Sequence, residues 1–294
     1  MTGAIVSGLA IPAGAPSGPA VSRLKLTIAY DGMGFAGSQR QAGQRTVQAE
    51  LEAAHGQLAG RPGPVTLASR TDAGVHAAGQ VGSVTDLVPH LETDTIRRAF
   101  AGLLPDDVSV WRVERVPPEF HARFDARWRE YRYRIWEGEP SPSQRRQSWQ
   151  RRWELDVEMM GLAAARLVGE RDFSPFANVT SPDANGGEGR SPGSPIRTIH
   201  ACRVHRVPGP WDVRVGAGTM IEIQVIANGF LRRMVRTIVG VLVEVGRGRH
   251  GVSWVERILA DRAERNATRV APAHGLVLWR VGYDDDEWRY EGRA

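Results

Sequence analysis

The spacing of apolar residues changes along the chain, and the order of these changes limits the fold more than any other feature of the sequence. Leu24, Leu26 and Ile28 alternate with polar or small residues, which is the two-residue period of a half-buried strand. Over 46–58 the apolar residues recur every three or four positions, as on one side of a helix. Thr46 can cap this helix, and Glu50 lies in its first turn, where a negative charge is favourable.

These patterns predict two successive sets of elements. The first has strands near 24–28, 65–69, 80–84 and 108–113, with helices at 46–58 and 93–103. The second has strands at 128–136, 196–207, 220–227 and 276–283, with helices at 157–168, 230–245 and 253–261. We therefore predict an α+β fold of two similar α/β halves, ferredoxin- or RRM-like, which form a largely antiparallel central sheet with helices on one side and a cleft between the halves.

The composition of the intervening segments predicts the domain boundaries. Residues 1–21 are rich in Gly, Pro and Ser and are expected to be a disordered tail. The N-terminal half is expected at 22–120, the C-terminal half at 121–284, and a charged tail at 285–294. Two polar stretches, 138–152 and 180–195, are expected to be surface loops.

Composition also restricts the class of protein. No apolar run approaches the roughly 18 residues of a membrane span, so we expect no membrane association. Cys202 is the single cysteine, which excludes an internal disulfide or a cysteine-based zinc site and fits a cytoplasmic location. The 38 basic residues exceed the 33 acidic ones, and Lys25 is the only lysine. Arginine suits phosphate groups, so an anionic partner is indicated, although weakly.

One motif suggests a dinucleotide site. Gly32, Gly34 and Gly37 match G-x-G-x-x-G after a predicted strand. That fingerprint must open a helix at once, but no helical period begins before Thr46. We therefore favour a glycine-rich loop, whose following Gln and Arg residues suit a polyanion. The histidines have no metal-ligand spacing, and we expect neither a metal nor a cofactor.

The candidate for chemistry is Asp72, in the segment Ser69–Ala77 between two short strands. An aspartate in a turn commonly bonds its own backbone, which is the structural interpretation. Arg70 and His76 are two potential cations near this carboxylate and would keep it ionised. Gly74 leaves room for a ligand, and the flanking strands would hold the loop rigid, as a positioned catalytic group requires.

The segment R-T-D-A-G-V-H-A at 70–77 resembles the signature of the tRNA pseudouridine synthase A family. Further blocks resemble this family in the same order, between about 24 and 283: Y-D-G…G-S-Q-R-Q (30–41), F-H-A-R-F (120–124), Y-R-Y (131–133), D-F-S-P-F (172–176), N-G-F…M-V-R-T-I-V-G (228–240) and A-P-A-H-G-L (271–276). Two features depart from the pattern. Ser38 replaces the usual Trp, so packing by that aromatic ring is lost, and the 180–195 loop is longer.

The resemblance implies a cofactor-free isomerisation of uridine to pseudouridine at positions 38, 39 and 40 of the tRNA anticodon stem-loop. Asp72 would act on the ribose of a flipped-out uridine, as nucleophile or as general base; the sequence leaves both open. Tyr131 would stack on the base; the alternative is that it is a strand aromatic packed in the core, and Tyr133, on the same strand face, competes for the stacking role. Arg236 would pair with Asp72, a role for which Arg70 could compete, and Leu276 would contact substrate.

Contacts to the RNA backbone are expected from six arginines: Arg40, Arg45, Arg123, Arg127, Arg129 and Arg232. Arg232 and Arg236 are four residues apart and would lie together on the 230–245 helix. The resemblance further implies a homodimer. Two alternatives remain at this point, a non-catalytic tRNA-binding module and a nucleotide-cofactor oxidoreductase.

Overall fold

A computed structural model of the chain describes residues 22–177, 194–207, 218–261, 263–264 and 270–284. The strands are β1 (Arg23–Tyr30), β2 (Thr66–Leu67), β3 (His76–Thr85), β4 (Val108–Val116), β5 (Trp128–Gly138), β6 (Trp149–Arg151), β7 (Gly169–Asp172), β8 (Ile196–Val207), β9 (Gly218–Ala227) and β10 (Leu276–Gly282). The helices in these ranges are α1 (Val47–Ala59), α2 (Thr93–Leu103), α3 (Val157–Ala165), α5 (Met234–Gly246) and α6 (Trp254–Ala260), with short 3₁₀ turns η1 (Gly32–Gly34), η2 (Ser174–Phe176) and η4 (Ala273–Gly275). The predicted tails and most of the predicted 180–195 loop lie outside the described residues.

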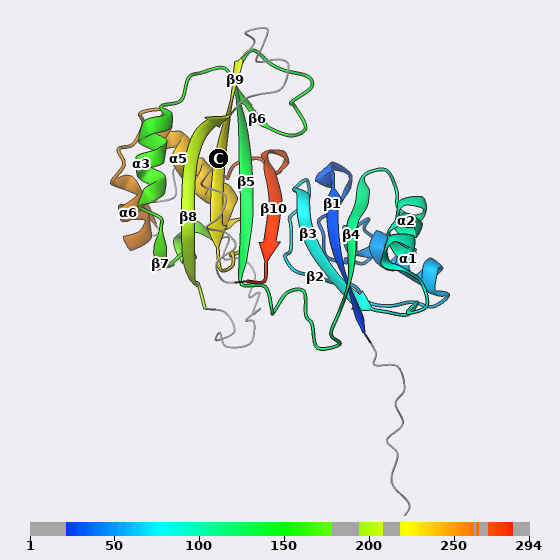
Figure 1. The fold of residues 1–294 in the computed structure, drawn as a ribbon. Coiled ribbons are helices and arrows are strands. Elements are labelled where there is room, and N and C mark those ends of the chain that lie inside the picture. Colours follow the sequence, from blue (N-terminus) through cyan, green and yellow to red (C-terminus); the bar gives the residue numbers. More distant parts are fainter. Residues whose placement is uncertain (1–21, 178–193, 208–217, 262, 265–269, 285–294) are drawn as a thin grey trace, which may run out of the picture.

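All ten strands belong to one sheet. Its order is β4-β1-β3-β10-β5-β9-β8-β7, with β2 beside β3 and β6 beside β5. Neighbouring strands are antiparallel except for the pairs β3–β10 and β5–β6, so the predicted mixed α/β fold with a largely antiparallel sheet is confirmed. Figure 1 shows β1 to β4 with α1 and α2 on the right and the later strands with α3, α5 and α6 on the left.

The two parts of the sheet meet where β3 runs beside β10, a strand from the C-terminal end of the chain (Figure 1). The pairing is short, with His76 opposite Val277 and Ala77 opposite Leu278. The loop that carries Asp72 leads directly into β3, and Leu276 begins β10. The segments predicted to carry chemistry are therefore brought to this junction.

Several element boundaries follow from local chemistry. Thr46 precedes α1 as predicted, and its Oγ1 accepts a hydrogen bond from the Ala49 N–H at 3.4 Å. The prediction of a helix from Phe230 is wrong, because α5 begins only at Met234. Arg233 has φ +61°, which a right-handed helix cannot contain. Arg232 therefore precedes the helix and is not one helical turn from Arg236.

Two smaller predictions also fail. The α3 helix ends at Ala165 rather than at 168, and its final turn is closed by 3₁₀-type bonds such as that from the Arg166 N–H to the Ala163 carbonyl. The predicted loop 138–152 contains a short strand, β6, which pairs in parallel with the end of β5. Polar composition concealed this strand, whose Trp149 packs edge-on against Tyr133 at 6.3 Å between ring centroids.

The two faces of β5 have different surroundings, one apolar and one charged. Tyr131, Tyr133 and Ile135 belong to one large apolar cluster that also includes the buried side of α5. On the opposite face, buried Glu130 accepts hydrogen bonds from Arg132 and Arg280. Charged residues of β5 thus pair with one another on one face, while the other face is available for the core and the cleft described below. No helix in the described part of the chain is long and apolar enough to cross a membrane.

The buried histidine of α1 gives a testable pH dependence. His55 is fully buried, and burial lowers its pKa; the nearby Asp86 carboxylate acts in the opposite direction but is outweighed. The unfolded chain therefore binds a proton that the folded chain resists, so the free energy of unfolding should fall as the pH drops below about 6.5. Denaturant titrations at pH 5 to 8 should show a weaker pH dependence in His55→Leu than in the wild type.

The exposed His90 supplies the control for the removal of an imidazole, as His90→Gln. Some dependence should remain in His55→Leu, because burial also lowers the pKa of His121 and of His274. Equal pH dependence in His55→Leu and in the wild type would contradict the assignment to His55.

Candidate active site

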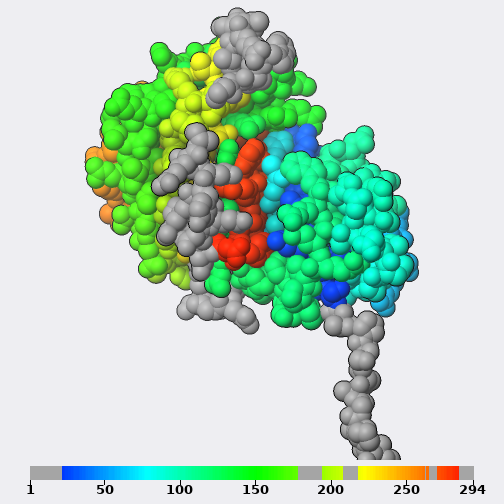
Figure 2. Space-filling view, viewed as in Figure 1, coloured from blue at the N-terminus to red at the C-terminus, as the bar shows by residue number. Residues whose placement is uncertain are grey.

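An open cleft of about 1080 Å³ lies at the junction of the two parts of the sheet. Its walls come from both parts, and its charge is strongly one-sided. Eight arginines line it: Arg70, Arg123, Arg127, Arg129, Arg197, Arg232, Arg233 and Arg236. Among the described lining residues, Asp72 is the one carboxylate. In the space-filling view, β10 in red is exposed between the two parts of the molecule (Figure 2).

The Asp72 loop is held through its neighbour Thr71. The Thr71 N–H donates to Ser38 Oγ at 2.9 Å, and the Ser38 N–H donates to the Thr71 carbonyl at 3.1 Å. The Thr71 hydroxyl also bonds the Tyr30 hydroxyl at 2.8 Å. Ser38 is fully buried. The sequence indicated only what Ser38 loses relative to a tryptophan; the structure shows that its hydroxyl fixes the loop.

Two glycines of the G-x-G-x-x-G match, Gly32 and Gly37, lie so close to the Asp72 loop that a side chain would not fit. A Cβ on Gly32 would lie 2.0 Å from the Val75 carbonyl oxygen, and one on Gly37 would lie 2.9 Å from that of Thr71. Gly37 also has φ +108°, a conformation that disfavours any side chain. No α-helix follows until Val47. These glycines therefore serve the packing of the Asp72 loop.

Asp72 forms an ion pair with Arg236 from the first turn of α5. Arg236 NH1 lies 3.0 Å from Asp72 Oδ2, and Arg236 Nε donates to the Ala271 carbonyl at 2.7 Å. This is the pair that the family resemblance implied. Both side chains are partly exposed, so the carboxylate stays accessible to a ligand in the cleft. Arg70, the predicted competitor, also lines the cleft.

His76, predicted as a second cation beside Asp72, has Asp31 as its carboxylate neighbour, with Nδ1 3.2 Å from Asp31 Oδ1. Its Nδ1 accepts a hydrogen bond from the Gly32 N–H at 3.2 Å, which leaves Nε2 to donate to the Arg146 carbonyl at 2.8 Å. His76 is the first residue of β3 and is not one of the lining residues. Its ring instead joins the β1 end to the 138–152 segment, where Arg146 also pairs with Asp31 at 3.1 Å.

Of the two candidate rings on β5, Tyr131 is the one at the cleft. Its hydroxyl bonds Ser69 Oγ at 2.9 Å, and its ring meets Phe230 edge-on at 5.0 Å. Burial raises the pKa of Tyr131, so its hydroxyl stays protonated. Tyr133 shares this face of the strand, as predicted, but is fully buried and donates to the Pro272 carbonyl at 3.0 Å. Leu276 lines the cleft as well.

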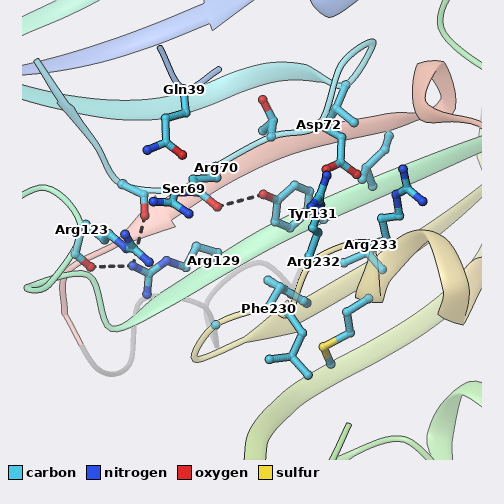
Figure 3. A pocket seen from close by; sticks show the side chains of 18 of the residues that line it. Gln39, Ser69, Arg70, Asp72, Arg123, Arg129, Tyr131, Phe230, Arg232 and Arg233 are labelled. Carbon is cyan, nitrogen blue, oxygen red and sulfur yellow. Dashed lines mark hydrogen bonds between the residues drawn. The ribbon is translucent and has the colours of Figure 1, made fainter. Parts of the chain in front are cut away.

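The six arginines expected at the RNA backbone separate into groups. Arg123, Arg127 and Arg232 line the cleft. Arg129 also lines it but is buried and donates to backbone carbonyls on several sides, at Ala68, Arg123, Ala126 and Asn228. Its guanidinium therefore holds the cleft walls together. In Figure 3, Arg123 and Arg129 lie at one end of the view, and Asp72, Arg232 and Arg233 lie toward the other, with Tyr131 between.

Arg40 and Arg45 lie outside the cleft lining. Arg40 pairs with Glu52, and Arg45 pairs with Asp107 at 2.7 Å and with Glu50 at 2.8 Å. The prediction missed three basic residues of the cleft lining: Arg197, His200 and Arg233. No local signal could have found Arg197 and His200, because the register of β8 decides which of its residues face the cleft. Within the described ranges, no group of three His, Cys, Asp or Glu residues could hold a metal ion.

Burial makes the stability of Tyr131 variants predictable. Tyr131 is 5% exposed, so Tyr131→Ala should lower the free energy of unfolding by about 3–5 kcal/mol, as other large aromatic truncations do. Tyr131→Phe keeps the ring and loses the bond to Ser69, at a cost of about 0.5–1.5 kcal/mol. Urea titration measures both. A Tyr131→Ala protein as stable as the wild type would contradict the packing seen here.

The sequence matches a known family over most of its length. A family model described as tRNA pseudouridine synthase matches residues 26–125 and 163–284. The chain is 41% identical to the tRNA pseudouridine synthase A of Roseiflexus castenholzii over 90% of this chain and 91% of the relative. It is 42% identical to that of Chloroflexus aurantiacus, over 88% of each chain, and 38% identical to that of Cutibacterium acnes, over 91% of each.

The family-model match includes the Asp72 loop and the start of α5 with Arg236, which meet in the cleft, whereas β5 with Tyr131 lies between the two matched segments. The match therefore covers the scaffold and the two partners of the ion pair. The chain belongs to the tRNA pseudouridine synthase family.

Proposed function

We propose that this enzyme isomerises uridine to pseudouridine at positions 38, 39 and 40 of the tRNA anticodon stem-loop, with Asp72 as the catalytic residue. One observation carries the proposal: among the described residues that line the cleft, Asp72 is the one carboxylate, paired with Arg236, and eight arginines lie around it. The charge of the cleft suits the RNA backbone, and the carboxylate supplies the reactive group.

The reaction needs few protein groups. The N1–C1′ bond breaks, the uracil turns, and C5 forms the new bond to C1′; the C5 hydrogen leaves and N1 gains one, so atoms balance. A carboxylate can attack C1′ or remove the proton on C2′, and Asp72 serves either route. Arg236 orients the carboxylate through Oδ2, which directs the other oxygen toward the ribose. No resident cofactor is required by this chemistry.

A uridine within a stem must leave the base stack before its ribose can reach Asp72, at a cost of a few kcal/mol. An aromatic surface offsets about 1–3 kcal/mol of this. Tyr131 lies at the cleft and is held in place by Ser69 and Phe230, so its ring is a preorganised platform. Leu276 at the start of β10 adds an apolar contact for the detached base.

We further propose that the chain divides at 22–120 and 121–284 into two similar α+β halves, with the cleft between them and part of the site on each. We also propose that the enzyme is a homodimer, as the resemblance implies, and that it is cytoplasmic, where its tRNA substrate is found. Sedimentation velocity tests the dimer; a monomer at micromolar concentration would contradict it.

The catalytic proposal predicts a loss of turnover in Asp72→Asn. The amide keeps the size of the side chain but cannot act as nucleophile or base. Release of C5 tritium from labelled tRNA should vanish, while the Kd for tRNA should stay within about tenfold, because phosphate contacts carry most of the affinity.

Asp94→Asn is the matched control, since Asp94 lies exposed on α2 and pairs only with neighbouring helix residues in the described structure. It should retain wild-type turnover. Turnover by Asp72→Asn would contradict the catalytic assignment. An inactive wild type would instead favour a non-catalytic tRNA-binding module.

The charge of the cleft predicts a strong salt dependence of RNA binding. Each phosphate contact contributes about 0.7 to 0.9 to the slope of log affinity against log salt. With at least three cleft arginines engaged, the slope should be about −2 or steeper, measured with anticodon stem-loop RNA and the Asp72→Asn protein. Arg40→Gln should leave it unchanged, because Arg40 is paired with Glu52 outside the cleft lining. A flat response would contradict phosphate binding in the cleft.

A further inference from the structure

Arg233 combines an unusual backbone with an unusual side chain. Among the described non-glycine residues it alone has a positive φ, +61°. This left-handed conformation brings Cβ close to the following carbonyl oxygen, and glycine or asparagine adopts it more readily than arginine. Arg233 immediately precedes α5, yet its side chain makes no capping hydrogen bond there. The fold itself therefore gives no reason for an arginine at this position.

The side chain of Arg233 is exposed and lines the cleft. Its guanidinium has no hydrogen-bond or ion-pair partner among the described residues, whereas Arg236, three residues later, is paired with Asp72. Figure 3 shows Arg233 toward the Asp72 end of the cleft, with Arg232. The Arg233 carbonyl accepts hydrogen bonds from the Thr237 N–H and hydroxyl, so the backbone serves the fold, whereas the guanidinium does not. An arginine side chain kept on a strained backbone without such a contact points to a ligand outside the folded chain.

The residues around Arg233 indicate which kind of ligand its guanidinium would bind. Asp72 is the only carboxylate among the lining residues that the structure describes, and Arg236 already binds its Oδ2. A planar guanidinium among other arginines complements a phosphate, which accepts two parallel hydrogen bonds. When the ribose of the target nucleotide reaches Asp72, the phosphates on either side of that ribose necessarily enter this end of the cleft.

We propose that Arg233 is a substrate-binding residue that holds a backbone phosphate next to the target uridine, and that its left-handed backbone directs the guanidinium into the cleft. The inference rests on the proposed RNA-binding function of the cleft. A helical conformation at Arg233 would extend α5 toward the N-terminus. The side chains of Arg232 and Arg233 would then point in other directions, which is why the strained conformation is kept.

The test compares Arg233→Asn with Arg233→Lys. The control is Arg98→Gln, which removes an exposed arginine of α2 that is not among the residues lining the cleft. Binding of anticodon stem-loop RNA is measured from 50 to 300 mM salt in the Asp72→Asn background. Arg233→Asn should bind about five- to eightfold more weakly at 0.1 M salt, with a salt slope shallower by about 0.7 to 0.9. Arg233→Lys should keep the wild-type slope, and so should Arg98→Gln.

Two further readouts separate binding from folding. With Asp72 intact, Arg233→Asn should raise KM by the same factor and leave kcat unchanged, as loss of a uniform binding contact does. Its melting temperature should equal or exceed that of the wild type, because asparagine tolerates the left-handed conformation. A large fall in melting temperature would assign Arg233 to the fold and overturn the proposal.

An unchanged salt slope and Kd in Arg233→Asn would also overturn it, as would an Arg233→Lys protein that behaves like Arg233→Asn. A wild-type protein whose RNA binding ignores salt would instead count against the proposed function of the whole cleft. The two failures are therefore distinguishable.

Discussion

The site depends on the ion pair between Asp72 and Arg236, because its two partners come from opposite sides of the sheet junction. Exposed pairs of this kind contribute only about 0.2–1 kcal/mol to stability, and this one is partly exposed. Its importance is therefore positional. Each partner is fixed independently: Thr71 is bound to Ser38 beside Asp72, and Arg236 is bound to the Ala271 carbonyl. The ion pair thus connects the Asp72 loop with α5 beside the short β3–β10 pairing.

The second constraint is the separation of charge within a chain whose net charge is only +5. Carboxylates elsewhere take arginines as partners, as Glu222 does with Arg132 and Arg134 on the far face of β5. The cleft excludes carboxylates other than Asp72 from its described lining. A modest overall charge thus leaves a strongly cationic groove, whose field attracts anionic ligands such as the backbone of the proposed RNA substrate.

Local chemistry made much of this predictable from sequence. The bounds of α2, the N-cap of α1 and the extent of β8 follow from periodicity and capping, and the motif blocks brought Asp72, Tyr131 and Arg236 together. The contacts that the sequence did not predict share one cause. The direction of His76, the hydroxyl contact of Ser38 and the buried carbonyl cluster around Arg129 depend on segments distant in the sequence. The positive φ of Arg233 was also unpredictable, because only glycine and, less often, asparagine or aspartate indicate this conformation in a sequence.

The G-x-G-x-x-G match shows that the spacing of glycines does not indicate a function until the contacts of those glycines are known. In a dinucleotide site the glycines let the backbone approach a pyrophosphate at the start of a helix. Here Gly32 and Gly37 let the backbone approach the carbonyls of Val75 and Thr71. The physical requirement, a missing Cβ at a close approach, is the same in both cases. What differs is the object approached, and in this chain that object is the loop that holds Asp72 against Arg236. The glycines therefore support the candidate active site through this loop, since a side chain on either one would displace the carboxylate that they help to hold.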